Sequence, residues 1–201
     1  MDGLGNIGAG KYTPAQKIPK TVAEAMAKQS EILAQSRLTY YAKRSIIQER
    51  EMANGSRRSR EYLLTQDDIK YVSGEAQAIS IPTNILVFNS GNQTGFRDSD
   101  TKIYIRGDIF PDESSSNNRD LLSVRATLAH EYYGHYKAHP SPYEIGDWRD
   151  EFNASYHAAI DAPTLSDEER ARLMIDAYDR AKEAGQNLEY DKIARRLIYG
   201  Y

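Results

Sequence analysis

The sequence predicts an α+β protein: a mainly helical domain with a small antiparallel sheet, preceded by a long N-terminal helix. Apolar residues recur at helical spacing before residue 60 and again after residue 120, as in helices with one buried face. Between these regions, residues 78–89 and 101–110 have the composition and length of strands, and the loop that separates them is long enough for a hairpin connection. Helices and strands segregated in this way are typical of the α+β class.

Three parts can be distinguished along the chain. Residues 1–19 are rich in Gly, Pro and Lys without an apolar period, and we expect a flexible arm there. Residues 20–60 are expected to form the N-terminal helical segment, because Thr21 and Glu24 have the spacing of a capping box and helical periodicity follows. Residues 61–201 would then form the main domain.

Capping residues and turns delimit the elements of the main domain. Thr65 to Asp68 has the composition of a helix start, and Ile103 and Ile105 alternate with polar neighbours, as in a half-buried strand. Ser166 and Glu169 have the spacing of a capping box at the start of a later helix. Four helical stretches are expected after the strands, at 121–136, 147–160, 166–184 and 191–197.

Composition excludes several classes of partner. The formal net charge of −3 provides no electrostatic attraction to nucleic acid, and we interpret the one positive run, Ser56 to Glu61, as a solvated face or a hinge. No stretch of 18 apolar residues exists, and the N-terminus lacks the pattern of a secretory signal. We therefore expect neither a nucleic-acid partner nor a membrane partner.

The histidines are the most informative residues of the chain. There is no cysteine, so any metal has to bind to His, Asp or Glu, and all four histidines lie between His130 and His157. His130 and His135 enclose the hexapeptide HEYYGH, in which Glu131 follows the first histidine. This arrangement predicts a metal site with Glu131 as the general base that activates water.

The five-residue spacing of His130 and His135 requires a departure from regular helix geometry. Ligands four apart lie about 40° apart around an α-helix, whereas ligands five apart lie about 140° apart and diverge. A single-turn π-bulge absorbs one residue and restores the alignment, and Gly134 makes that distortion easier. We therefore expect a bulge within the motif.

The third ligand is expected to be a carboxylate on a second helix packed against the first. In the stretch WRDEFNASYHAA, Glu151 is the preferred ligand, although a helix dipole alone would also favour acidic residues in that first turn. Ala154 would allow the two helices to approach closely, and Ser155 could hold a ligand imidazole from behind. The alternative carboxylates are Glu144, Asp147 and Asp150.

A rival set of ligands fits a regular helix. Glu131, His135 and His139 are spaced four and four, so an undistorted helix would align all three. His139 precedes Pro140, however, and the residue before a proline is disfavoured in helical conformation. This set is the second choice.

The two motifs together resemble those of the gluzincin metallopeptidases. HEYYGH followed by DEFNAS is similar to the dipeptidyl peptidase III family, which pairs a HELLGH-type helix with an EExxA-type helix. The resemblance covers residues 130–155 and implies that His130, His135 and Glu151 hold Zn²⁺ while Glu131 activates water.

The second motif departs from the family pattern at two positions. Asp150 replaces the first Glu, and Ser155 stands where an acidic residue is usual. Exopeptidase specificity is therefore not carried over to this chain.

A longer part of the chain, from KIYIRG through LAHEYYGHY to RLIYGY, is similar to compact zincin domains of bacterial polymorphic toxins and phage-associated proteins. This likeness implies a zinc-dependent hydrolase that cleaves peptide bonds in a peptide or protein substrate, with an inhibitor or immunity protein as a further partner. It implies either a cytoplasmic location or delivery as part of a larger secreted toxin or phage protein.

The zincin likeness also suggests contacts with a substrate. In zincins, an edge strand ahead of the motif helix binds substrate by strand addition, and Thr101 to Phe110 is placed either to do so or to be an ordinary strand. The oxyanion of the transition state needs a donor besides the metal. His157 is the preferred catalytic candidate for this role, ahead of Tyr156 and Tyr143.

Two other functions would use the same residues. An interaction protein with a structural metal would have a closed site of four ligands, with His139 or His157 as the fourth and the N-terminal helix as a partner-binding face. A zinc hydrolase of a non-peptide substrate, such as an amidase, would share every residue of the site, so the sequence does not separate it from a peptidase.

Overall fold

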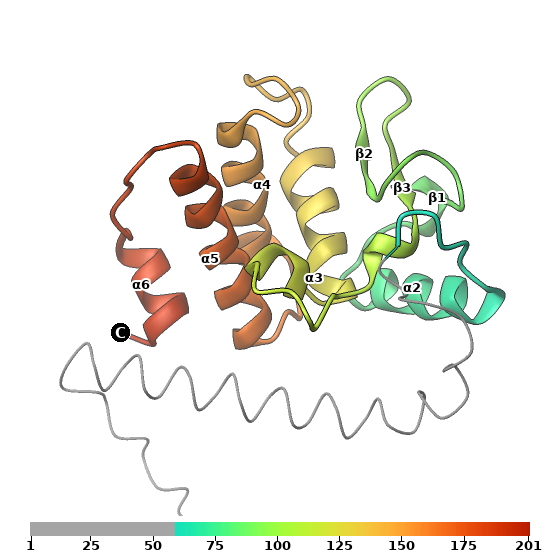
Figure 1. The fold of residues 1–201 in the computed structure, drawn as a ribbon, viewed down its shortest axis with the longest axis horizontal. Coiled ribbons are helices and arrows are strands. Elements are labelled where there is room, and N and C mark those ends of the chain that lie inside the picture. The colour runs from blue at the N-terminus through green and yellow to red at the C-terminus, as the bar shows by residue number, and fades with distance from the viewer. Residues whose placement is uncertain (1–58) are drawn as a thin grey trace, which may run out of the picture.

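A computed structural model describes residues 59–201 of the chain, and the α+β class is confirmed for them (Figure 1). The predicted arm at 1–19 and the N-terminal helix that begins after Thr21 lie outside the described residues. The longer helices are α2 (Gln66–Ala78), α3 (Val124–Ala129), η4 (His130–Tyr136), α4 (Trp148–Asp161), α5 (Asp167–Glu183) and α6 (Lys192–Tyr199). Short 3-10 helices occur at Thr83–Ile85, Gly107–Ile109 and Asn118–Leu121.

Helices α2 and α5 begin where the capping residues predict. The Thr65 hydroxyl accepts a hydrogen bond from the Asp68 amide at 3.2 Å, and the Asp68 carboxylate accepts one from the Thr65 amide at 2.9 Å. Ser166 and Glu169 form the same reciprocal pair at the start of α5, which confirms the predicted capping box. Helix α5 ends just before Gly185, whose φ of 76° is a left-handed conformation that favours glycine.

The sheet is mixed rather than antiparallel throughout, which corrects the prediction. Its strand order is β1 (Leu86–Phe88), β3 (Lys102–Ile105), β2 (Gly95–Arg97). Strand β1 runs parallel to β3, whereas β2 runs antiparallel to it on the other side. The two predicted strands do not form a hairpin with each other, because the loop between them supplies β2, and β2 makes the hairpin with β3.

Strand β3 alternates between the core and the outer face as predicted. Ile103 and Ile105 are fully buried, while Tyr104 between them is partly exposed. Because β3 is paired on both sides, it is the central strand, so of the two alternatives for Thr101 to Phe110 the structure shows the ordinary sheet strand and not the edge strand. The edge next to the motif helix is β2 instead, since β2 contacts η4 directly.

The predicted distortion of the motif helix is present as a π-helix. Helix α3 continues without a break into η4, where the Lys137 amide donates to the Tyr132 carbonyl, five residues earlier, at 2.9 Å. The seven residues of η4 exceed the single-turn bulge that the spacing predicts. The motif helix lies between the sheet and α4, so both sides of it are covered (Figure 1).

Helices η4 and α4 cross in close contact at Gly134 and Ala154. A Cβ atom added to Gly134 would lie 2.5 Å from both Cα and O of Ala154, so only glycine fits at this crossing. The close approach expected of Ala154 is therefore confirmed. The contact requires glycine at position 134 because a side chain would collide with Ala154. It does not require the backbone freedom of glycine, because the φ of Gly134 is not in the left-handed region.

The hydrophobic core extends from the sheet to α5 and includes Tyr132 and Tyr133 of the motif helix. Its fully buried large side chains are Val72, Ile79, Ile103, Ile105, Ile109, Leu128, Leu173 and Met174. Within the described part of the chain, none of the helices has both the length and the apolar character needed to cross a bilayer.

Candidate metal centre

Two imidazoles of the π-helix face the same point. The Nε2 atoms of His130 and His135 are 3.1 Å apart, and both side chains are buried. Hydrogen bonds in a π-helix join residues five apart, so side chains at this spacing align, whereas an α-helix would turn them away from each other. The backbone therefore accommodates the additional residue of the motif.

Glu151, in the first turn of α4, completes a group of three candidate ligands. Its Oε2 atom lies 3.4 Å from His130 Nε2, and its Oε1 atom lies 3.8 Å from His135 Nε2. One ligand atom from each of the three residues lies within 4.8 Å of the others. Burial would raise the pKa of Glu151, but the two histidines and Arg180 outweigh this and hold it well below its usual value.

His130 is held from behind by Ser155, as the sequence predicts for that residue. The Ser155 hydroxyl lies 2.8 Å from His130 Nδ1 and donates a hydrogen bond to Asp176 Oδ2 at 2.5 Å. Ser155 and Asp176 are both almost completely buried. The contact directs Nε2 of His130 toward the other two candidate ligands.

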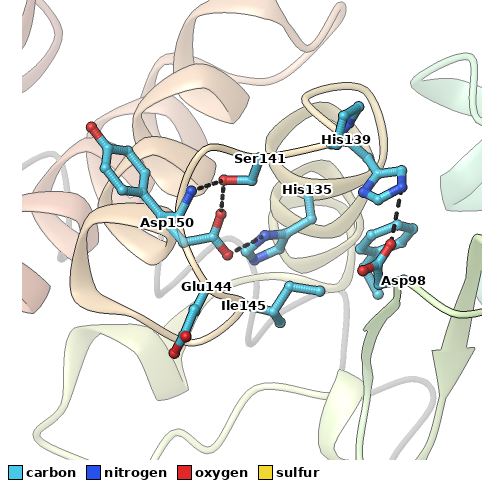
Figure 2. A pocket seen from close by; sticks show the side chains of 10 residues that line it. Asp98, His135, His139, Ser141, Glu144, Ile145 and Asp150 are labelled. Carbon is cyan, nitrogen blue, oxygen red and sulfur yellow. Dashed lines mark hydrogen bonds and ion pairs between the residues drawn. The ribbon is translucent and has the colours of Figure 1, made fainter.

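His135 is held by Asp150, which the sequence suggested only as an alternative ligand. Asp150 Oδ2 lies 3.2 Å from His135 Nδ1 in an ion pair, and Asp150 Oδ1 accepts a hydrogen bond from the Ser141 hydroxyl at 2.7 Å (Figure 2). The ion pair is not an aligned hydrogen bond, because Asp150 Oδ2 has no hydrogen-bond partner in the described part of the chain. Burial lowers the pKa of His135, but the nearby carboxylates, with Asp150 foremost, outweigh this and raise it.

Glu131 is anchored on the sheet and does not belong to the group of ligands. Its Oε2 atom accepts a hydrogen bond from the Phe96 amide of strand β2 at 2.7 Å, and its side chain is only 8% exposed. The other carboxylate oxygen is not used by this bond. Glu131 is also near enough to His135 for its charge to contribute to raising the pKa of that imidazole. A carboxylate beside the candidate metal ligands is the position that a general base requires.

Helix α5 contributes two charged residues that the sequence analysis did not identify. Arg180 donates to Asp176 Oδ2 through Nε at 2.8 Å and to Glu151 Oε2 through its terminal nitrogen. A sequence signal existed, since Asp176 falls within the apolar stripe of α5 between Leu173 and Ala177. A charged residue inside such a stripe indicates a buried polar contact.

His157, the preferred oxyanion donor, is not brought to the site, which corrects that prediction. Its side chain is 51% exposed and its Nδ1 atom lies 3.3 Å from Asp161 Oδ2. On a regular α-helix, a residue six positions after Glu151 points about 120° away from it. Tyr156 also faces elsewhere, because its hydroxyl donates to Asp191 Oδ2 at 2.7 Å.

His139 lies across a pocket from His135 rather than joining it as a ligand. Its Nε2 atom is 2.9 Å from Asp98 Oδ1, and its ring centroid is 5.6 Å from that of Phe96. The rival ligand set of Glu131, His135 and His139 therefore does not form. The π-helix ends at Tyr136, so His139 follows in a loop and is not on the helix face that holds His135.

The pocket is a hollow of about 330 Å³ that opens beside His135 (Figure 2). Its wall combines apolar and acidic side chains from β2, the loop after η4 and the start of α4. The residues that line it are Phe96, Asp98, His135, His139, Pro140, Ser141, Tyr143, Glu144, Ile145 and Asp150. Tyr143 and Glu144, considered above as an oxyanion donor and a ligand, thus belong to this wall.

The donor set fits Zn²⁺. Imidazole nitrogens and a carboxylate oxygen are ligands that zinc prefers, and catalytic zinc sites use three protein ligands. Nδ1 of each histidine faces a polar partner on α4, which leaves Nε2 of both directed at Glu151. Among the described residues, no fourth His, Asp or Glu joins the group.

Comparisons with known proteins found no relative, so the function has to be inferred from the geometry of the site. No protein-family model, no curated protein and no solved structure matches the chain. The resemblance to gluzincins and to toxin-associated zincins therefore stays a prediction from the two motifs.

Proposed function

We propose that the protein is a zinc-dependent hydrolase that cleaves peptide bonds. The observation that carries the proposal is the convergence of His130, His135 and Glu151 on one point, with the carboxylate of Glu131 beside them. Zn²⁺ bound there would supply a Lewis acid that polarises the scissile carbonyl and makes water more acidic.

Glu131 acts as the general base in this proposal. The Phe96 amide holds Oε2 of its carboxylate, so the orientation of the base is set by strand β2 before any substrate arrives. The other oxygen can accept the proton of the attacking water and pass it to the leaving amine. The sequence also predicts this role for Glu131, and the hydrogen bond from strand β2 accounts for the position of its carboxylate.

The substrate would occupy the pocket beside His135. The pocket is lined by residues of β2, of the loop that follows η4 and of the start of α4, and His135 and Asp150 are among them. His139 also lines this pocket, so it, and not the exposed His157, is the imidazole outside the ligand group that a bound substrate could contact. An extended peptide could also pair with β2, which is an edge strand.

The alternative of an interaction protein with a structural metal has less support. Such a site needs a fourth protein ligand, and the two histidines considered for it are engaged elsewhere, His139 with Asp98 and His157 with Asp161. An amidase would use the same residues as a peptidase. The expected toxin or effector context rests on the motif resemblance alone and stays a prediction.

The proposal is tested by measuring zinc content and peptide hydrolysis in the same preparations. We expect one Zn²⁺ per chain in the wild type, retention of that zinc with loss of hydrolysis in Glu131→Gln, and loss of both in His130→Ala and Glu151→Ala. His157→Ala serves as a control that keeps both, since that side chain is exposed and outside the group. A wild-type protein without bound metal, or a Glu131→Gln variant that hydrolyses peptides normally, would contradict the proposal.

A further inference from the structure

A buried chain of polar side chains leads from α5 to the candidate metal centre. It runs from Arg180 to Asp176, from Asp176 to Ser155, and from Ser155 to His130, with separations of 2.8, 2.5 and 2.8 Å. Asp176 is 1% exposed and Ser155 is fully buried. Burying such groups is unfavourable unless their hydrogen bonds are satisfied, so the chain calls for a specific explanation.

The direction of the hydrogen bonds in this chain determines the tautomer of His130. Asp176 Oδ2 accepts from Arg180 Nε, which is always a donor, and also from the Ser155 hydroxyl. The single proton of Ser155 is thereby used, so its oxygen can only accept from His130 Nδ1–H. A neutral imidazole protonated at Nδ1 has its lone pair at Nε2, the atom that faces Glu151 and His135.

Arg180 links the same chain to the third candidate ligand. Its guanidinium binds Asp176 through Nε and Glu151 Oε2 through a terminal nitrogen, so one planar group fixes two carboxylates. Because Arg180 binds Oε2 of Glu151, the other carboxylate oxygen, Oε1, is not bound by Arg180. On the far side of Asp176, Oδ1 lies 3.6 Å from Arg119 Nε, which adds a second compensating charge.

We infer that Asp176 and Arg180 are positioning residues of the metal centre. Asp176 acts through Ser155 to hold His130 in the tautomer whose Nε2 can bind a divalent cation, and Arg180 orients Glu151 so that a single oxygen is available to the same cation. This inference rests on the proposed metal site but not on the hydrolytic reaction. It assigns to α5 a role in metal affinity that neither sequence motif contains.

The first test replaces Asp176 with leucine, a side chain of similar size, in the full chain. Leucine has no oxygen to accept the Ser155 proton, so the Ser155 hydroxyl can donate to His130 and the preference for protonation at Nδ1 is removed. NMR correlation of ring protons with ring nitrogens in the metal-free protein reads the tautomer directly. We expect protonation at Nδ1 in the wild type and its loss in Asp176→Leu, together with a fall of about 10–100-fold in Zn²⁺ affinity, measured by competition with a chromophoric chelator.

Helix α5 offers a matched control two turns before the proposed pair. Arg172 and Glu168 form the same i,i+4 ion pair on the same helix, at 3.1 Å, without contacting the candidate ligands. We expect Arg180→Lys to weaken Zn²⁺ binding, because an ammonium cannot bridge two carboxylates as a guanidinium does. Arg172→Lys and Glu168→Gln should leave both the tautomer and the affinity unchanged.

The outcomes separate this inference from the proposed function. A wild type that binds no Zn²⁺ contradicts the proposed function, while the tautomer in metal-free protein still tests the chain of hydrogen bonds. Wild-type tautomer and affinity in folded Asp176→Leu would overturn the inference even if hydrolysis is normal. Should Asp176→Leu not fold, Ser155→Ala removes only a hydroxyl from the same chain, and an unchanged His130 tautomer in that variant would overturn it as well.

Discussion

The two histidines of the motif are similar in burial and direction but differ in what supports them. His130 is held through Ser155 by Asp176, a residue of α5 that lies 46 positions further along the chain. His135 is held by Asp150, which is 15 positions away and is itself bound by Ser141 of the intervening loop. The His130 side is therefore supported from a third helix, α5, whereas the His135 side is supported by the start of α4 and the loop before it, at the wall of a pocket.

This difference separates the tasks of the two sides. The His130 side is closed by the crossing of η4 and α4 and by the packing of α4 on α5, and its supporting residues Ser155 and Asp176 are almost completely buried. The His135 side opens into the pocket, where a substrate would enter. One side would thus maintain the geometry of the metal site, and the other would admit the reactant.

The largest effect is expected from Gly134→Ala, which tests whether the His130 side depends on close packing. The added Cβ would lie 2.5 Å from backbone atoms of Ala154, so the two helices have to separate. Overpacking against backbone should lower the free energy of unfolding by about 3 kcal/mol. Denaturant unfolding of the metal-free protein measures it.

Gly74→Ala is the matched control for that substitution. Gly74 lies within α2, and a Cβ added there meets no atom within 4 Å. Replacing a helical glycine with alanine at an open position should raise the free energy of unfolding by about 0.5–1 kcal/mol. Equal effects of the two substitutions would show that the crossing at Gly134 is not closely packed.

A smaller effect is expected from Asp150→Asn, which changes the support of His135. The substitution removes the charge that faces Nδ1, and we expect a fall of about 10–100-fold in Zn²⁺ affinity. Because this support adjoins the pocket, the metal-free variant should lose less stability than Asp176→Asn does. Chelator competition and thermal unfolding of both variants measure the two quantities, and a greater loss of stability in Asp150→Asn would reverse the comparison.

The smallest effect concerns the outer end of the helical layer, where Asp191 caps α6 and accepts from the Tyr156 hydroxyl of α4. Burial raises the pKa of Asp191, but hydrogen bonds from the Ala194 amide and Tyr156 outweigh this and lower it. A pKa lower in the folded than in the unfolded state stabilises the fold above the unfolded value, and the contribution disappears as pH falls through the folded value.

Asp191→Asn tests this pH dependence while keeping a side chain that caps helices equally well. We expect the wild type to be slightly more stable above about pH 5, and the difference in melting temperature from the variant to decrease toward zero as the pH is lowered further. A difference that stays constant with pH would contradict the expected contribution of the Asp191 charge.

Local features of the site could be predicted from the sequence because they depend on neighbouring residues. Capping boxes at Thr21 and Ser166 are local patterns, and the second is present within the described residues. The five-residue spacing of His130 and His135 requires a distorted helix wherever both imidazoles face one point, and the π-helix provides it. For the third ligand, the sequence favours Glu151 but leaves Glu144, Asp147 and Asp150 as alternatives.

Other features depended on which elements come together. Strand β2 has too little periodicity to be recognised in a loop, and only its pairing with β3 makes it the edge that anchors Glu131. His157 was favoured for its nearness to Glu151 in sequence, but the turn of α4 directs it to solvent.

For residues 59–201, the sequence by itself indicated the long helices, the distorted motif and the three candidate ligands, because periodicity, capping and ligand spacing operate over a few residues. Only the tertiary structure decided how those ligands are oriented. Asp176 and Arg180 reach His130 and Glu151 because α5 packs against α4, and the distances that define a hydrogen bond between two helices are not contained in the spacing of either one.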